Sequence, residues 1–235
     1  MDKQKMVAMA ERIYRDVSGA MATGLAHLGA ESGLFAAMSG RGPMSQALVI
    51  EASGLQPRYV EEWLHGMVCA GYLDYDPVAE TYALPEEHAY LLSSVGTDHY
   101  MGGMFGMPPP LLAQAPRLLQ AMRDGGGVPF GDFAPACRHA IDVMNRGNYD
   151  NRLADYWLAQ LPDVVARLQA GGRVLDVGCG HGHAAIALAK GFPASEIVGV
   201  DPDAASIAEA RAAAAAAGTP GIRFVHATLD GIPEQ

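Results

Sequence analysis

The sequence predicts a mainly α-helical N-terminal domain of winged-helix type, followed by a partial α/β domain of Rossmann-like type with an incomplete sheet. Three observations predict this order. Apolar residues recur at helical spacing up to about residue 70. Two short runs rich in aromatic and β-branched residues then flank Asp76-Pro77. From residue 173 the chain alternates strand, glycine loop, helix and strand. At 235 residues and 50% hydrophobic, it can bury the core of one large or two small domains.

The first forty residues predict two packed helices. A break in the helical pattern follows at Ser39-Gly40-Arg41-Gly42-Pro43, where glycine and proline end regular structure. The second helix covers residues 26–37. The apolar positions of the first helix are Ala8, Ile13, Val17, Met21 and Leu25.

The winged-helix prediction rests on the next segment. Ser45 can cap a helix that Gly54 closes, and Pro57 opens a second helix that Gly71 closes. Residues 72–75 and 81–84 then predict a short β-hairpin. Helix, turn, helix and hairpin in this order form the winged-helix pattern, and we place this domain at residues 1–100. The residues expected to face inward on the second helix are Val60, Trp63, Leu64, Met67 and Val68.

Residues 101–170 predict a helical connector. Glycines and prolines interrupt a Met-rich, low-charge segment around one helix, Leu111–Arg123. Helical periodicity returns over residues 136–146 and 153–168. The third part, residues 171–235, is the α/β domain.

The motif that carries chemistry lies at residues 173–182, Arg-Val-Leu-Asp-Val-Gly-Cys-Gly-His-Gly. An apolar strand containing Asp176 leads into a loop with glycines at 178, 180 and 182 before a helix. A second strand ends in Asp201 about 20 residues later, as a nucleotide-binding βαβ unit requires. The glycines let backbone N–H groups approach a ligand, and Asp201 can accept two hydrogen bonds from a ribose diol.

Asp176 separates two classes of ligand. A carboxylate two residues before the first glycine would repel the pyrophosphate of a dinucleotide, but it suits a ligand with a cationic amino-acid end. Here the chain resembles the class I S-adenosylmethionine-dependent methyltransferases, whose first motif is matched by Val174–Gly182 and whose ribose-binding acidic residue is matched by Asp201. The resemblance implies S-adenosyl-L-methionine as cofactor. It also implies cofactor-binding roles for Asp176, Gly178, Cys179, Gly180, Gly182, Asp201 and Pro202, the loop at the methionine end and Asp201 at the ribose.

Adenine recognition has two candidate forms. The family usually carries an acidic residue after the third strand, and Thr228 stands at this position here, with Asp230 two residues later. Backbone groups of Thr228 and Leu229 could bind the adenine, or Asp230 could reach it.

The family sheet has seven strands, and this sequence supplies three of them. The strand at 173–177 would then offer an open row of backbone donors and acceptors, which drives pairing or aggregation. We therefore expect a fragment of a longer methyltransferase, which could be inactive alone, or another chain that covers this edge.

Charge argues against nucleic acid as a partner. The net charge is −10 at pH 7, and Arg41–Tyr90 alone carries 2 basic and 8 acidic residues. Glu61 and Glu62 occupy the outer face of the would-be recognition helix, where a DNA reader needs basic or amide side chains. In the family that the chain resembles, such a domain serves dimerisation, so we expect a homodimer.

The cysteines and the lengths of the apolar segments indicate the cellular compartment of the protein. The three cysteines are few and widely spaced, which disfavours a disulfide framework. Charges interrupt the apolar positions of the N-terminus, and no stretch has the ~18 uncharged apolar residues of a membrane span. We expect a cytoplasmic protein with no membrane partner.

The function implied by the resemblance is methyl transfer from S-adenosylmethionine to a small-molecule acceptor, with residues 101–170 forming part of the acceptor site. The alternatives are a winged-helix transcriptional regulator with a ligand-sensing domain and an NAD-dependent oxidoreductase. His139 is a candidate general base, because its ordinary pKa suits pH 7. Cys179, His181 and His183 would splay outward on a tight glycine turn, so we expect no metal site.

Overall fold

The computed structural model describes residues 1–129, 132–133, 135–228 and 231. The chain forms two compact units. The winged unit comprises Met1–Val95 and Tyr100–Arg117, and the α/β unit comprises Gly96–His99 and Leu118–Gln235. The expected three-part division stays a proposal, and residues 101–117 of its connector belong to the winged unit.

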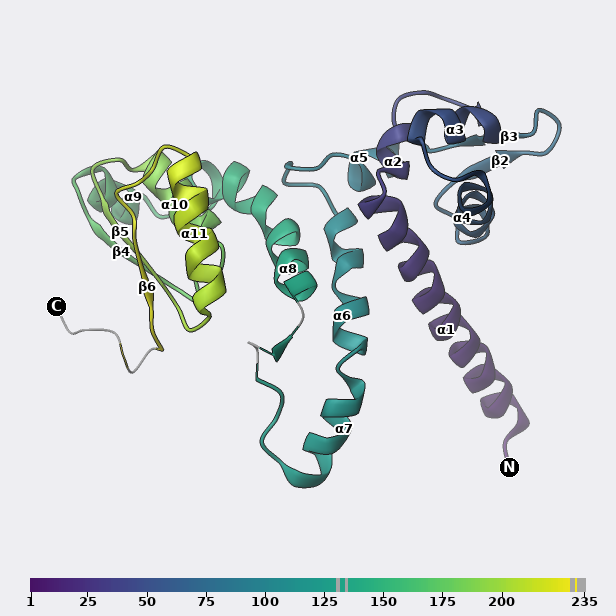
Figure 1. The fold of residues 1–235 in the computed structure, drawn as a ribbon, viewed down its shortest axis with the longest axis horizontal. Helices are drawn as coiled ribbons and strands as arrows, with labels where there is room; N and C mark the ends of the chain where they lie inside the picture. The colour runs from purple at the N-terminus through teal and green to yellow at the C-terminus, as the bar shows by residue number, and fades with distance from the viewer. Residues whose placement is uncertain (130–131, 134, 229–230, 232–235) are drawn as a thin grey trace. The chain divides into compact units, whose positions relative to one another are not determined.

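The winged unit begins with one long helix, α1 (Lys3–Glu31), drawn in dark purple in Figure 1. The Asp2 side chain caps it by accepting hydrogen bonds from the backbone N–H groups of Gln4 and Lys5. The short α2 (Leu34–Met38) starts after Gly33, whose φ of 78° turns the chain. Two helices were expected here, and the first is longer than the sequence pattern indicated.

The helix–turn–helix and hairpin are confirmed. Ser45 caps α3 (Gln46–Ser53), which ends at Gly54 in the left-handed region. Pro57 is the first residue of α4 (Pro57–Cys69). Strands β2 (Asp74–Asp76) and β3 (Thr81–Ala83) form the hairpin, and β1 (Met44–Ser45) pairs with β3 on its other side.

Trp63 on α4 organises the apolar core of the winged unit. Its indole Nε1 donates a hydrogen bond to the Leu25 carbonyl on α1 (2.9 Å), and its ring meets Phe35 edge to face at 5.1 Å. Gly29 lets α1 approach this ring, because a Cβ there would lie 2.5 Å from it. The unit closes with α5 (Glu86–Leu92), η1 (Gly102–Gly106) and α6 (Pro108–Leu112).

Two helices expected in the connector are each divided. The helix expected at Leu111–Arg123 ends with α6 and restarts as α7 (Ala115–Asp124), because Pro116 is tolerated only in a first helical turn. The helix expected at 153–168 is interrupted at Leu161, which precedes Pro162 and has non-helical backbone angles. The elements found there are the π-helix η3 (Tyr149–Trp157), the 3₁₀ helix η4 (Leu158–Gln160) and α9 (Pro162–Gln169).

The α/β unit contains a parallel sheet in the order β4-β5-β6. Its elements are α8 (Pro135–Asn148), β4 (Arg173–Val177), α10 (His183–Gly191), β5 (Glu196–Asp201), α11 (Ala204–Ala216) and β6 (Arg223–His226). Figure 1 shows α10 and α11 beside these strands. As expected, β4 lies at an edge of the described sheet, with Leu175 and Val177 about half exposed (50% and 51%). The predicted fold class is therefore confirmed.

Candidate cofactor site

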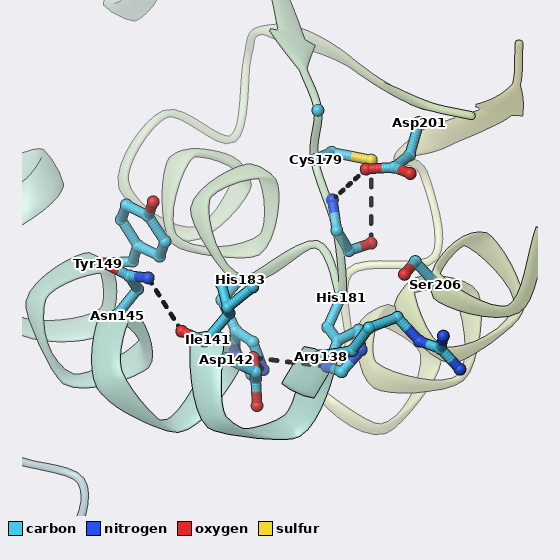
Figure 2. A pocket seen from close by; sticks show the side chains of 12 residues that line it. Arg138, Ile141, Asp142, Asn145, Tyr149, Cys179, His181, His183, Asp201 and Ser206 are labelled. Carbon is cyan, nitrogen blue, oxygen red and sulfur yellow. Dashed lines mark hydrogen bonds and ion pairs between the residues drawn. The ribbon is translucent and has the colours of Figure 1, made fainter. Parts of the chain in front are cut away.

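A pocket of about 170 Å³ opens at the carboxyl ends of β4 and β5, the usual ligand position in parallel sheets. It lies within the α/β unit, between the glycine loop and α8, as Figure 2 shows. The lining residues are Arg138, Ile141, Asp142, Asn145, Tyr149, Gly178, Cys179, Gly180, His181, His183, Asp201 and Ser206.

The glycines of the loop permit its curvature. Gly178, Gly180 and Gly182 all have positive φ values, of 73°, 50° and 79°. Gly182 also packs against the ring of Phe224 on β6, and a Cβ at this position would lie 2.8 Å from that ring. Gly199 on β5 meets the same ring, also at 2.8 Å from its absent Cβ. The Phe224 ring thus packs against both the loop, at Gly182, and β5, at Gly199.

Four N–H groups of the loop donate within the protein, and the expectation that the loop amides hold a ligand stays a prediction. The N–H groups of Gly178 and Cys179 both donate to the Val200 carbonyl, at 2.8 and 3.1 Å. The Gly180 N–H donates to Asp201 Oδ2 (2.9 Å), and the Gly182 N–H donates to the Cys179 carbonyl (2.8 Å). The sequence showed that the loop could turn, but not that its donors would be satisfied within the protein.

Asp201 lies at the tip of β5 and is buried. Its Oδ2 accepts from Gly180 and its Oδ1 accepts from the Asp203 N–H (2.8 Å). A carboxylate oxygen can accept two hydrogen bonds, so each oxygen keeps capacity for a ligand in the pocket that it lines. Asp201 therefore fixes the loop and remains able to meet a diol.

Asp176 lies on β4, paired in register with Gly199 of β5. Its Oδ2 is buried and has no hydrogen-bond partner. Burial and the nearby Asp201 raise the pKa of Asp176, while the Ala185 amide in the first turn of α10 opposes the shift. Asp176 is half-buried and does not itself line the pocket, but a carboxylate with an unpartnered oxygen next to a second carboxylate favours a cationic ligand.

Of the predicted cofactor residues, Asp176, Gly182, Pro202 and Thr228 are not among those that line the pocket. Pro202 and Thr228 are exposed and do not line the pocket. Leu229 and Asp230 lie outside the described residues. His139 is exposed on α8 and is not among the lining residues.

Sequence reasoning missed the wall opposite the loop, which is one face of α8 continued by Tyr149. Arg138, Asp142 and Asn145 recur at intervals of four and three residues, which places them on the same side of a helix. Figure 2 shows Arg138 and Asp142 beside His181, and Asn145 beside Tyr149 with its amide donating to the Ile141 carbonyl (2.8 Å). The available signal was polar residues at helical spacing in a segment that has apolar residues on its other side.

Asp142 is the most buried of these charged groups, with 6% of its side chain exposed. Its Oδ1 lies 3.1 Å from His183 Nε2 and 3.6 Å from His181 Nδ1, and its Oδ2 accepts from Arg146 one turn later on α8. Burial alone would raise the pKa of Asp142, but the hydrogen bonds from His183 and Arg146 lower it to about 2. Asp142 is therefore ionised across the physiological pH range.

Cys179 and the two histidines do not form a metal site. Burial, with Asp176 and Asp201 nearby, raises the pKa of the Cys179 thiol to about 12, so the thiol stays protonated. Among the described residues no group of three or more potential ligands could hold a metal ion.

Two family models match the chain. The Rv2258c-like winged HTH domain matches residues 19–94, and the methyltransferase domain matches residues 174–235. The chain joins a winged helix–turn–helix domain to a methyltransferase domain. No curated protein matches the chain.

Solved methyltransferases share this fold. The mitomycin 7-O-methyltransferase MmcR is 16% identical, with a TM-score of 0.66 over 100% of this chain and 70% of its own. A putative O-methyltransferase from Nostoc punctiforme is 20% identical, with a TM-score of 0.68 over 93% of this chain and 64% of its own. Human N-acetylserotonin methyltransferase, solved with S-adenosylmethionine, is 19% identical, with a TM-score of 0.63 over 100% and 69%. The chain thus spans about two thirds of these proteins.

These findings confirm the predicted methyltransferase domain over residues 174–235, and these solved proteins, at 16–20% identity, share the fold of the chain. In the described part of the chain, no helix is both long and apolar enough to cross a membrane.

Proposed function

We propose that this chain binds S-adenosylmethionine in the pocket between the glycine loop and α8, and serves in methyl transfer to a small-molecule acceptor. The observation that carries the proposal is the pair of carboxylates at the ends of β4 and β5. Asp176 has a buried oxygen without a partner, and Asp201 lines the pocket with accepting capacity left.

The residues present fit this cofactor. Its amino-acid end carries an ammonium group and its sulfur a positive charge, and both would offset the mutual repulsion of Asp176 and Asp201. Of the proposed set, Gly178, Cys179 and Gly180 line the pocket. Because their N–H groups are paired within the protein, their contribution is carbonyl oxygens and shape.

The alternative dinucleotide is disfavoured by the same charges. A pyrophosphate needs free N–H donors or cations at the glycine loop. The N–H groups of Gly178, Cys179 and Gly180 are already used, and Asp201 stands next to them. This arrangement supports the methyltransferase over an NAD-dependent oxidoreductase.

When bound, the cofactor supplies an electrophilic methyl group, and an acceptor oxygen, nitrogen or carbon takes it as the sulfur–methyl bond breaks. The residues of this chain bind and orient. Asp201 fixes the loop through Gly180, and the α8 face covers the pocket from the opposite side. Alignment of two reactants provides most of the rate in such a displacement, so few side chains need to act as acids or bases.

Titration calorimetry with S-adenosylmethionine, S-adenosylhomocysteine and NAD tests the proposal. We expect both adenosyl ligands to bind and NAD to bind more weakly or not at all. Asp201→Ala should weaken binding by ~1.5–3 kcal/mol, the cost of a lost charge-assisted hydrogen bond. The proposal fails if NAD binds more tightly than either adenosyl ligand, or if Asp201→Ala folds and binds as the native chain does.

The proposal extends to a homodimer through α1. Only Ala26 and Gly29 of this helix are buried. Its large apolar side chains are 47–76% exposed, which a helix of this length does not sustain in water without a partner. These side chains are Met6, Val7, Met9, Ile13, Tyr14, Val17, Met21 and Leu28.

Light scattering coupled to size exclusion tests the dimer. Ile13→Glu places a charge in the apolar stripe and should shift the chain to monomer. Ala8→Glu, on the opposite face of α1, is the matched control and should leave the mass unchanged. A monomeric native chain, or equal behaviour of the two variants, contradicts the proposal.

A DNA-reading role has no support from the winged unit. Arg58, the one Lys or Arg in α4, forms ion pairs with Glu61 (3.7 Å) and Glu62 on the same helix. The helix that would enter the major groove therefore presents no unpaired arginine or lysine.

A cytoplasmic location is supported by Cys69, Cys137 and Cys179 all being free thiols.

A further inference from the structure

The α8 helix lines the cofactor pocket with two charged side chains, Arg138 and Asp142. Asp142 contacts both histidines of the glycine loop, and its side chain is 6% exposed. His181 and His183 are themselves 13% and 18% exposed. Burying an ion pair costs desolvation energy that apolar packing avoids, so such a cluster is weak evidence for a purely stabilising role.

The histidines are built into the loop at alternate positions, between and after its glycines. A contact that holds either ring in place therefore also restrains the backbone of residues 180–183. On its other side, His181 Nε2 lies 3.2 Å from Glu209 Oε2 of α11 without a hydrogen bond. The ring thus stands between carboxylates of α8 and α11.

A second contact from α8 reaches the other border of the pocket. Arg138 lies 3.5 Å from Asp203, which caps the N-terminus of α11. The Asp203 N–H in turn donates to Asp201, whose second oxygen holds Gly180. The loop is therefore connected to one face of α8 at two places: at Gly180 through Asp201, Asp203 and Arg138, and at His181 and His183 through Asp142.

We propose that Asp142 is a positioning residue, which holds the glycine loop in its binding conformation through His181 and His183. Asp142 Oδ1 lies 3.1 Å from His183 Nε2 and Oδ2 accepts from Arg146, so the contacts with the histidines are the route by which Asp142 acts on the loop. The loop is then shaped before a ligand arrives, which reduces the entropy lost on binding. This inference rests on the proposed cofactor pocket, but its effect on the loop exists without ligand.

Amide hydrogen exchange of the full chain without ligand is the first test. Asp142→Asn keeps the side-chain shape and removes the charge, and it should speed exchange in residues 178–185 by about tenfold while the winged unit is unchanged. Asp155→Asn, the same change at an exposed position of η3, is the matched control and should alter neither.

Affinity for S-adenosylmethionine is the second test. Asp142→Asn should weaken binding about tenfold, and His183→Ala should act on the same contact, so the double variant should be no weaker than the worse single variant. Additive losses, or unchanged loop exchange in Asp142→Asn, overturn the inference.

The two readouts separate this inference from the proposed function. If the native chain binds no S-adenosylmethionine, the proposed function fails, and the exchange data alone decide the role of Asp142. If Asp142→Asn unfolds, His183→Ala tests the same contact from the loop side. Exchange that rises throughout the α/β unit in His183→Ala, without selectivity for the loop, means that the cluster is structural and overturns the inference.

Discussion

The two units of the molecule bury different kinds of side chain. The core of the winged unit is made of apolar residues such as Leu34, Leu64 and Met67, packed around Trp63. Among the described residues, the buried carboxylates are Asp142 and Asp201, and both belong to the α/β unit. Apolar burial stabilises any fold, whereas a buried charge costs energy and persists where it has a task. The difference agrees with the proposed roles, the winged unit as scaffold and the α/β unit as the binding unit.

The largest expected effect is a loss of stability on truncating a side chain in the apolar core of the winged unit. Leu64 is fully buried on α4, and Leu64→Ala should destabilise the winged unit by about 2–5 kcal/mol through lost burial and a cavity. Denaturant unfolding measures this loss. The affinity of the folded chain for S-adenosylmethionine should not change, because no residue of the winged unit lines the pocket.

Leu48→Ala is the matched control for this change. Leu48 is 50% exposed on the neighbouring α3, so the same truncation there should alter the unfolding free energy by less than about 0.5 kcal/mol. A comparable loss at both positions would contradict the distinction between core and surface in this unit.

Asp176→Asn in the α/β unit should do the reverse of Leu64→Ala: it should lower the affinity for S-adenosylmethionine without lowering the stability of the chain. Because burial and Asp201 raise the pKa of Asp176, its ionisation at neutral pH costs stability; this cost builds up as the pH rises from the ordinary pKa of 3.8 to the raised folded pKa and is constant above it. The variant should therefore be at least as stable as the native chain without ligand. It should bind S-adenosylmethionine about 10–100-fold more weakly, since a charged acceptor is lost.

Thermal unfolding and calorimetry on the same samples measure both effects. Asp155→Asn, an exposed change in the same unit, should leave both values unaltered. A less stable Asp176→Asn with native affinity would reverse the predicted roles of burial and binding at this carboxylate.

The smallest expected effect is the loss, at acid pH, of the stability that ionised Asp142 contributes. The pKa of Asp142 is lowered from its ordinary value of 3.8 to about 2 in the folded chain, so its ionised form favours folding. This contribution, on the order of 2 kcal/mol, is present above pH about 4 and disappears as the pH falls towards 2. The stability difference between the native chain and Asp142→Asn should shrink over that interval. A constant difference would mean that the charge of Asp142 does not contribute.

The sequence predicts elements whose causes are local. Ser45, Gly54 and Pro57 mark helix ends through their own backbone and capping chemistry, and the structure has helix ends at these positions. The strand, glycine loop and Asp201 were recognisable for the same reason, since each acts within a short βαβ unit. The local signals failed where a proline divides a helical pattern, at Pro116 and Pro162.

The candidate site was only half predictable because its second wall depends on contacts between distant segments. Asp142 and His183 are 41 positions apart in sequence, and no local pattern indicates that they meet. The pairing of the Gly178, Cys179 and Gly180 N–H groups is likewise set by Val200 and Asp201 on β5. Periodicity identifies the face of α8, but only the packed structure shows what that face meets.

The ring of Phe224 behind Gly182 and Gly199 sets an order of events during folding. This ring arrives on the third strand of a parallel sheet, after a helical crossover, and such non-local pairings form slowly. Until that strand docks, nothing fills the space under the loop. Competence to bind ligand should therefore appear in step with the docking of β6, and a stopped-flow binding signal would time that docking.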